Sequence, residues 1–168
     1  MLSLAGLGLI AGAIAAMFGA VSYGTTSEQQ IHALISQRQA VTRRVSNAIR
    51  DAREVLDQSD DSITLWTEDK DNDGKRDNDE LKIIKRDAEQ NRLVVYIGQS
   101  NQTRNLDDLL ENLVTAPDFT QKVWAERVTG FTTATTHDGR LVSYRMGLRR
   151  GQMQETAISA ARLRHQTN

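Results

Sequence analysis

The chain opens with a long apolar segment in which no charged side chain occurs before Glu28. Leu, Ile, Met, Phe and Val side chains fall there among Ala and Gly, and a helix of this length covers a hydrocarbon core of roughly 30 Å. A cleavable signal peptide normally opens with basic residues, and none precedes this run. We therefore predict a transmembrane helix over 1–24. Gly8, Gly12 and Ala16 recur at the spacing that lets another helix approach closely, or simply fill a weak span.

Apolar side chains then recur at helical spacing as far as Leu56, with no proline to interrupt them. The pattern predicts an amphipathic helix over 25–58 that continues directly from the span. Its opposite face is polar and basic, and either meets solvent or contacts neighbouring subunits. The residues on that face are Gln29, Gln30, Arg38, Arg43, Arg44, Arg50 and Arg53.

Alternation of apolar and polar residues dominates the remainder, 59–168, which we expect to form a small β-rich domain. One short helix is predicted at Asn105–Val114, where four leucines form a stripe before Pro117. The fold class is therefore predicted as α+β, with a long N-terminal helix packed on one antiparallel β-sheet. The predicted strands are Ser62–Thr67, Leu81–Lys85, Arg92–Ile97, Val123–Thr135 as hairpin partner of Val142–Arg149, and Glu155–Leu163.

Composition excludes several classes of function. The 168-residue chain has a formal net charge of −1, which offers no electrostatic basis for binding nucleic acid. It contains no cysteine, so disulfides, zinc-thiolate sites and thiol catalysis are excluded. The three histidines, His32, His137 and His165, show no ligand spacing, and no catalytic motif is present. We therefore predict that the protein is not an enzyme.

The segment 69–80 carries the clearest chemical motif, because it matches the D-x-D-x-D-G-x5-E calcium-loop pattern in full. Calcium requires six or more hard oxygen ligands and a sharp turn, for which Gly74 is suited. Side-chain oxygens, and one backbone carbonyl from Lys75, would supply them, with Glu80 contributing both carboxylate oxygens. The predicted ligands are Asp69, Asp71, Asp73, Lys75, Asp77 and Glu80.

Two features distinguish this loop from a paired EF-hand. Arg76 occupies the place where an aliphatic residue normally contacts a partner loop, and the flanking segments have strand character. We predict a solitary calcium loop in a β-hairpin. The alternatives are an acidic turn without an ion, since Asp, Asn and Gly favour turns, and magnesium, which demands tighter octahedral geometry. Calcium is preferred, because crowded carboxylates without a cation repel one another.

An uncharged helix that runs into an amphipathic one, followed by a β-rich domain with a calcium loop, resembles the type IV pilin superfamily. The nearer resemblance is to minor pseudopilins of type II secretion systems, especially the J-type. It is carried by Met1-Leu2-Ser3-Leu4-Ala5 at the start of the helix, Leu65-Trp66-Thr67-Glu68-Asp69 before the loop, and the closing strand Ala157–Leu163. The resemblance implies a pilin-like fold. The prepilin leader of that family is not present in this sequence. One explanation is that Met1 lies inside the true helix; the alternative is a chain that begins at Met1, without the peptidase processing and the acid-mediated assembly contact of that family.

The resemblance implies a structural subunit of a type II secretion or type IV pilus-like filament, stabilised by calcium. Its partners would be other pilin or pseudopilin subunits, bound through the N-terminal helix, and the inner membrane, with no nucleic acid. The expected localisation is the bacterial inner membrane, single-pass, with the C-terminal domain in the periplasm or extracellular. Arg38, Arg43 and Arg44 after the span would by themselves favour the cytoplasm. The alternative function is a membrane-anchored periplasmic calcium-binding or adaptor module that does not polymerise.

Overall fold

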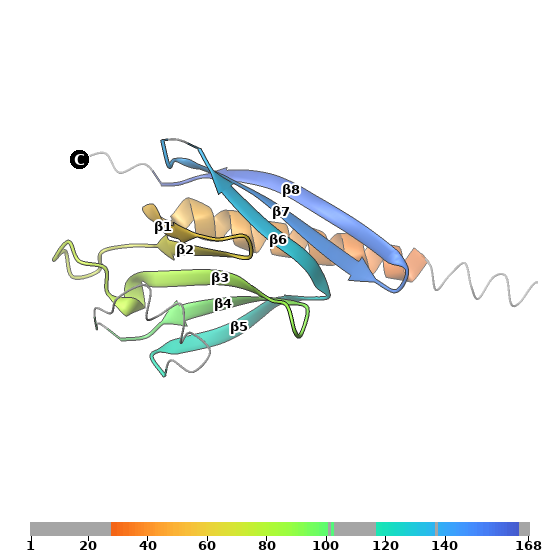
Figure 1. Ribbon diagram of the computed structural model, residues 1–168, viewed down its shortest axis with the longest axis horizontal. Coiled ribbons are helices and arrows are strands. Elements are labelled where there is room, and N and C mark those ends of the chain that lie inside the picture. The colour runs from red at the N-terminus through yellow and green to blue at the C-terminus, as the bar shows by residue number, and fades with distance from the viewer. Residues whose placement is uncertain (1–27, 101, 103–116, 137, 165–168) are drawn as a thin grey trace, which may run out of the picture.

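The computed structural model describes residues 28–100, 102, 117–136 and 138–164 (Figure 1). These residues form a helix over 28–51, eight β-strands and a short 3-10 helix, η1 (Asn78–Glu80). Neighbouring strands pair antiparallel throughout. The strands are β1 (Glu54–Gln58), β2 (Ser62–Trp66), β3 (Leu81–Asp87), β4 (Arg92–Gly98), β5 (Phe119–Glu126), β6 (Val128–Thr135), β7 (Leu141–Arg150) and β8 (Met153–Arg162).

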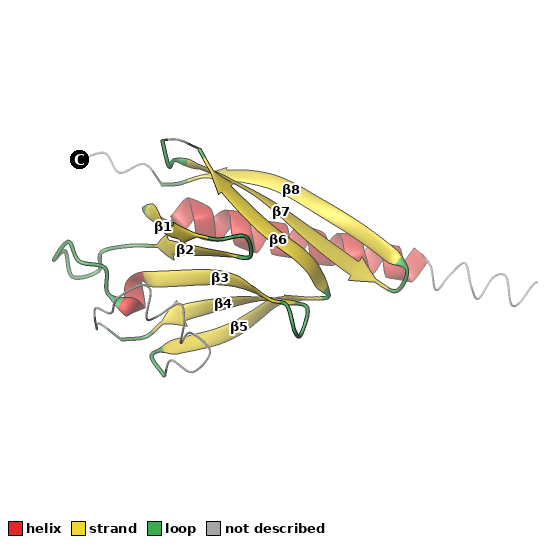
Figure 2. Ribbon diagram, viewed as in Figure 1, coloured by secondary structure: helices red, strands yellow, loops and turns green. Residues whose placement is uncertain are grey.

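The strands belong to two separate sheets, each of which follows chain order (Figure 2). The first sheet has the order β1-β2-β3-β4-β5, and the second has the order β6-β7-β8. The helix runs behind both sheets, and its described part starts at the end of the molecule opposite the 69–80 loop (Figure 1). The edge strands, at which a further strand could pair, are β1 and β5 in the first sheet and β6 and β8 in the second.

The chain passes from the first sheet to the second at Arg127, which has a positive φ of 60°. This left-handed backbone turns the chain between β5 and β6, so that β5 pairs with β4 while β6 pairs with β7. The predicted strand Val123–Thr135 is accordingly wrong as a single element. Alternation of side chains is equally compatible with one long strand or two short ones, and only the partners distinguish them.

One hydrophobic core joins the helix to both sheets. The helix contributes a buried stripe that includes Leu34, Val41 and Ile49, and the second sheet contributes Phe131 and Met146. A smaller cluster lies on the other face of the first sheet and contains Leu81, Ile83, Val94 and Tyr96. Because β4 is buried on both faces along most of its length, its sequence contains a continuous apolar run, Leu93–Ile97.

The predicted fold class, α+β with a long N-terminal helix on one antiparallel sheet, is wrong. The described residues form a mostly-β fold with two antiparallel sheets and one helix over 28–51. Helical spacing continues past Arg50 in the sequence, but Glu54–Gln58 pair with β2 as strand β1. Pairing with a neighbouring strand outweighs local helical periodicity there, because propensity is a weak determinant of structure beside tertiary contacts.

The predicted localisation, a single-pass inner-membrane protein, is also corrected. Among residues 28–100, 102, 117–136 and 138–164, no helix has the length and apolar character needed to cross a bilayer. The predicted span over 1–24 lies outside the described residues, as does the predicted short helix Asn105–Val114. The positions of the predicted strands that became β2, β3, β4, β7 and β8 are confirmed to within a few residues.

Candidate metal centre

The 69–80 loop connects two paired strands, as the hairpin interpretation predicted. Strand β2 pairs antiparallel with β3, and Trp66 faces Leu81 at the last step of the ladder before the loop. The ladder is extended by one bond, from the Thr67 N–H to the Glu80 carbonyl at 2.9 Å. The hairpin therefore holds the first and last residues of the loop close together before any ion is considered.

Three of the predicted ligands converge at the outer part of the loop. Asp69, Asp71 and Asp73 each direct one carboxylate oxygen into a group whose members all lie within 4.8 Å of one another. A local hydrogen bond shapes this turn: the Asp73 backbone N–H donates to Asp71 Oδ1 at 3.2 Å. Gly74 follows with a positive φ of 73°, a conformation that glycine adopts without strain.

Asp69 differs from the other two aspartates because it is mostly buried. Its side chain is 11% exposed, and Oδ2 lies 3.5 Å from the guanidinium of Arg53. Its other oxygen, Oδ1, is buried and has no hydrogen-bond partner among the described residues. A buried carboxylate oxygen without a partner carries a desolvation penalty, which a bound cation would remove.

Lys75 places its own positive charge on the cluster. Its ammonium lies 2.9 Å from Asp73 Oδ2, and its backbone N–H donates to Asp73 Oδ1 at 2.7 Å. These hydrogen bonds, first that of the side chain and then that of the backbone, lower the pKa of Asp73. The same pairing raises the pKa of Lys75. The carboxylate is thus kept ionised and available to a metal ion, but the ammonium competes for it.

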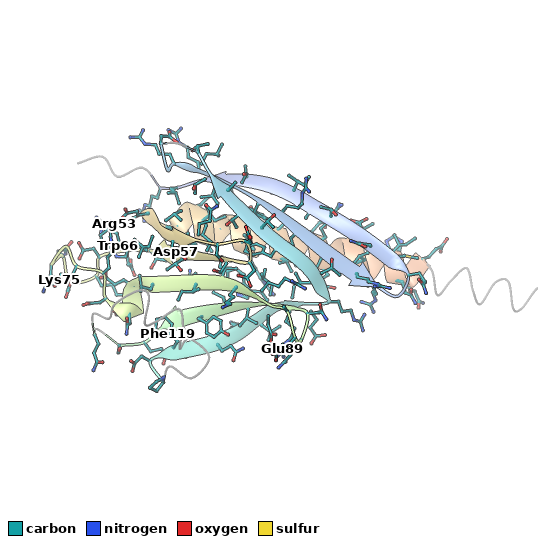
Figure 3. All side chains as sticks on the ribbon, in the orientation of Figure 1. Arg53, Asp57, Trp66, Lys75, Glu89 and Phe119 are labelled. Atoms are coloured by element: carbon teal, nitrogen blue, oxygen red, sulfur yellow. The ribbon has the colours of Figure 1, made fainter. Side chains whose placement is uncertain are left out.

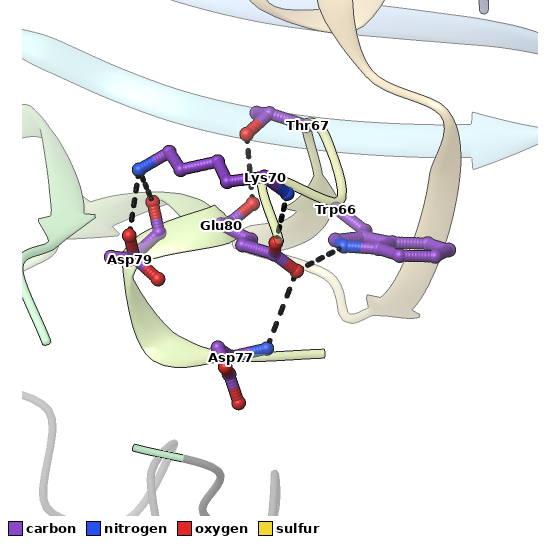
Figure 4. Close-up of polar contacts among 6 residues, drawn as sticks. All are labelled: Trp66, Thr67, Lys70, Asp77, Asp79 and Glu80. Atoms are coloured by element: carbon purple, nitrogen blue, oxygen red, sulfur yellow. Dashed lines mark hydrogen bonds and ion pairs between the residues drawn. The ribbon is translucent and has the colours of Figure 1, made fainter. Parts of the chain in front are cut away.

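Glu80 is placed differently from the ligand role that the motif predicts. Its side chain is buried, with 2% exposure, and Oε2 accepts a hydrogen bond from the Trp66 indole at 2.9 Å (Figure 4). Oε1 accepts from the Lys70 N–H, and Oε2 also accepts from the Asp77 N–H at 3.4 Å. Glu80 therefore anchors both ends of the loop.

The structure does not bring Asp77 and Glu80 into the carboxylate group that Asp69, Asp71 and Asp73 form. Asp77 is buried immediately before η1, and its carbonyl accepts the Glu80 N–H at 3.0 Å. Next to it, Asp79 binds the Lys70 ammonium at 2.8 Å, which closes the loop on its other side. Lys75, whose carbonyl was predicted as a ligand, lies next to the group through its contacts with Asp73.

Two arginines that were not predicted as ligands, Arg53 and Arg76, contact Trp66 at the base of the loop. The Arg53 guanidinium carbon lies 4.7 Å from the centroid of the Trp66 ring, and that of Arg76 lies 5.7 Å from it. Arg76 also pairs with Glu54 of β1 at 2.9 Å. Figure 3 shows Arg53 and Trp66 at the base of the loop and Lys75 on the loop itself. Arg76, which stands where a paired calcium loop has an aliphatic residue, therefore contacts Glu54 and Trp66 of its own chain.

Comparison with known proteins yields no match, since no protein-family model, curated protein or solved structure is similar to this chain at a significant level.

Proposed function

We propose that this chain is a structural subunit of a pilin-like or pseudopilin filament, with a calcium ion that stabilises the 69–80 loop. Its activity is assembly and not catalysis. The observation that carries the calcium part is the convergence of Asp69, Asp71 and Asp73 within 4.8 Å. Calcium binds oxygens at roughly 2.3–2.6 Å, so two ligands on opposite sides of one ion lie about 5 Å apart. The observed spacing fits one ion.

The buried environment of Asp69 supports the same proposal. Within the part of the chain that the structure describes, its Oδ1 atom lacks a hydrogen-bond partner, while Arg53 contacts the other oxygen. Arg53 follows the helix and donates its backbone N–H to the Trp66 carbonyl at 2.8 Å. An ion at Asp69 would therefore stiffen the loop and also the junction between the helix and β2. Lys75, Asp77, Glu80 and water would complete the ligands after the loop adjusts.

The filament part of the proposal is supported by the helix. Its apolar stripe is used within the chain's own core, whereas a row of polar side chains remains exposed, among them Gln39, Arg43 and Asn47. A helix that joins a β-rich domain through one side and leaves the other open can pack against neighbouring subunits. The second support for the filament part is the sequence resemblance to minor pseudopilins.

Calcium binding is tested with the intrinsic fluorescence of Trp66, which contacts both arginines at the base of the loop. The chain has two tryptophans, so the variant Trp124→Phe leaves Trp66 as its single tryptophan. We expect calcium to change its emission saturably, and Asp71→Asn to weaken that response. Asp60→Asn, an exposed carboxylate outside the loop, is the matched control and should leave the response unchanged. An identical calcium response in Asp71→Asn and the control would refute the ion site.

Assembly is tested by disulfide cross-linking in the native host. Because the chain has no cysteine of its own, every cross-link must come from the introduced thiol. Ser36→Cys and Ala40→Cys place thiols on exposed helical positions, and Lys122→Cys places one on β5 as a control. We expect the helical variants to give oxidant-dependent cross-links to pilin-type subunits carrying a matching cysteine, and the control to give none. Monomer alone from both helical variants would favour a calcium-binding module that does not polymerise.

A further inference from the structure

Strand β8 presents a long free edge. The Leu163 N–H bonds to the Arg140 carbonyl at 2.9 Å, which assigns this residue pair to the hydrogen-bonded positions of the ladder with β7. Because such positions alternate in an antiparallel pair, the backbone groups of the intervening residues point away from β7. These residues are Gln154, Thr156, Ile158, Ala160 and Arg162. None of their outward N–H and carbonyl groups is hydrogen-bonded to the part of the chain that the structure describes.

The helix lies beside this edge but leaves a groove of about 710 Å³ between them. Residues 156–159 of β8 line one side of the groove. The other side is lined by helix residues that include Arg43, Asn47 and Arg50. Within the described residues, neither Arg43 nor Arg50 forms an ion pair, whereas Arg38 is paired with Glu155 at 2.7 Å. Two available cations therefore face the open strand edge.

The exposed face of the same edge is apolar at its centre. Ile158 is 69% exposed, the highest value among the large hydrophobic side chains of the described residues. Long, uncovered edges with central apolar residues are sites where another strand pairs, and proteins usually block them with charges or coverings. At β5, an edge strand of the first sheet, the helix covers part of the edge. Arg44 and Gln37 donate there to the carbonyls of Trp124 and Glu126. No such contact covers the described β8 edge.

We propose that β8 binds an extended segment of a partner protein in which apolar and acidic residues alternate. An added strand continues the sheet through main-chain hydrogen bonds, and its side chains point alternately to the two faces. On one face they meet Ile158, which favours apolar residues. On the other they point toward the helix, where Arg43 and Arg50 favour carboxylates.

A second copy of this chain is a poorer occupant than an acidic strand. Pairing of β8 with its own copy brings two sets of Arg43 and Arg50 to one seam, and like charges across an interface are unfavourable. Gln39, Arg43 and Asn47 line this groove and also belong to the helix face proposed for filament contacts, so the two proposals place different partners on one surface. The peptide test uses the unassembled chain, and its failure leaves the cross-linking test of the filament unaffected.

The probe is a short fluorescent peptide in which Val and Glu alternate, and its charge-reversed counterpart carries Lys in place of Glu. We expect the full chain to bind the Val/Glu peptide at least about tenfold more tightly, with the preference reduced by added salt. Binding should slow the exchange of the Thr156, Ile158 and Ala160 amide protons, which face away from β7. Protection at β1 or β5 instead, or equal affinity for both peptides, would overturn the proposal.

Two kinds of variant test separately the main-chain pairing at β8 and the charges of Arg43 and Arg50. Ala160→Pro removes an outward N–H that β7 does not use, so it should abolish binding while the melting temperature remains nearly unchanged. If that variant unfolds, the double variant R43E/R50E provides the test, because it should reverse the preference toward the Val/Lys peptide. Lys122→Glu on β5 is the charge control and should retain the original preference. A dimer that forms through β8 without peptide, seen by sedimentation, would identify a second copy as the occupant and refute the proposal.

Discussion

The indole N–H of Trp66 donates a 2.9 Å hydrogen bond to the carboxylate of Glu80, and so the last residue of β2 holds the last residue of the calcium-loop motif. Glu80 also accepts the backbone N–H groups of Lys70 and Asp77. A carboxylate with three donors in a buried setting is a structural anchor in its own right. The loop is therefore closed by the protein, and an ion would act mainly on the three aspartates.

This relationship predicts that Glu80 and Asp71 differ in their dependence on calcium. Glu80→Ala removes a buried carboxylate and leaves three buried or partly buried N–H donors without their acceptor. We expect it to lower the free energy of unfolding by about 3 kcal/mol in the presence of a chelator. Asp71→Ala removes an exposed carboxylate, and its loss of stability should be seen only when calcium is added. Urea denaturation with calcium and with EDTA measures both. A Glu80→Ala effect that disappears in EDTA would show that Glu80 acts only through the ion.

The pairing of Lys75 with Asp73 predicts a specific dependence on pH. The pKa of Asp73 is lowered by the Lys75 side-chain hydrogen bond, so its contribution to stability is present above the ordinary carboxyl pKa and is lost as pH falls through the lowered pKa. The pKa of Lys75 is raised, so its contribution is present below the ordinary lysine pKa and is lost as pH rises through the raised pKa.

Lys75→Gln should consequently raise the pKa of Asp73 toward its ordinary value, which the carboxyl carbon shift of Asp73 reports in an NMR titration. The same variant should bind calcium a few-fold more tightly, because no ammonium competes for Asp73. Lys122→Gln is the control and should change neither quantity. Weaker calcium binding by Lys75→Gln would mean that the ammonium orders the loop for the ion.

A buried hydroxyl network links the helix to the second sheet. The Tyr144 hydroxyl donates to the Thr42 carbonyl at 2.8 Å and lies 2.8 Å from the Ser46 hydroxyl. We expect Tyr144→Phe to reduce the free energy of unfolding by about 1–2 kcal/mol, because it leaves the buried partners of this hydroxyl unsatisfied. A double-mutant cycle with Ser46→Ala measures the coupling. Fully additive losses would show that the two hydroxyls contribute independently.

Two glycines in strands predict opposite responses to alanine. A Cβ at Gly98 would lie 1.5 Å from the Asn78 backbone carbonyl oxygen, so Gly98→Ala must displace the segment that closes the calcium loop. We expect a loss of at least about 2–3 kcal/mol, in line with overpacking of a filled site. A Cβ at Gly130 meets nothing within 4 Å, and Gly130→Ala should be neutral or slightly stabilising. Thermal melts of the pair measure the difference, and similar melting temperatures would contradict the close approach.

The fold illustrates which predictions local patterns support. Val142, Tyr144, Met146 and Leu148 alternate with polar residues, and β7 contains all of them because one of its faces is buried. The spacing of Asp69, Asp71 and Asp73 likewise anticipated their convergence, since a tight turn around Gly74 brings alternate side chains to one side. In both cases the signal is a two-residue spacing, which can be read from side chains a few positions apart in the sequence.

The sequence by itself therefore determined the strand positions and the carboxylate spacing of the loop. The tertiary structure decided the rest. Glu54–Gln58 became a strand because β2 is available to pair with it, and Arg127 separates β5 from β6 because each finds its partner in a different sheet. Glu80 became a buried anchor because the indole of Trp66, at the end of β2, donates a hydrogen bond to its carboxylate. Each outcome depends on residues distant in the chain, whose pairing is chosen by the free energy of the whole core and leaves no local periodicity to read.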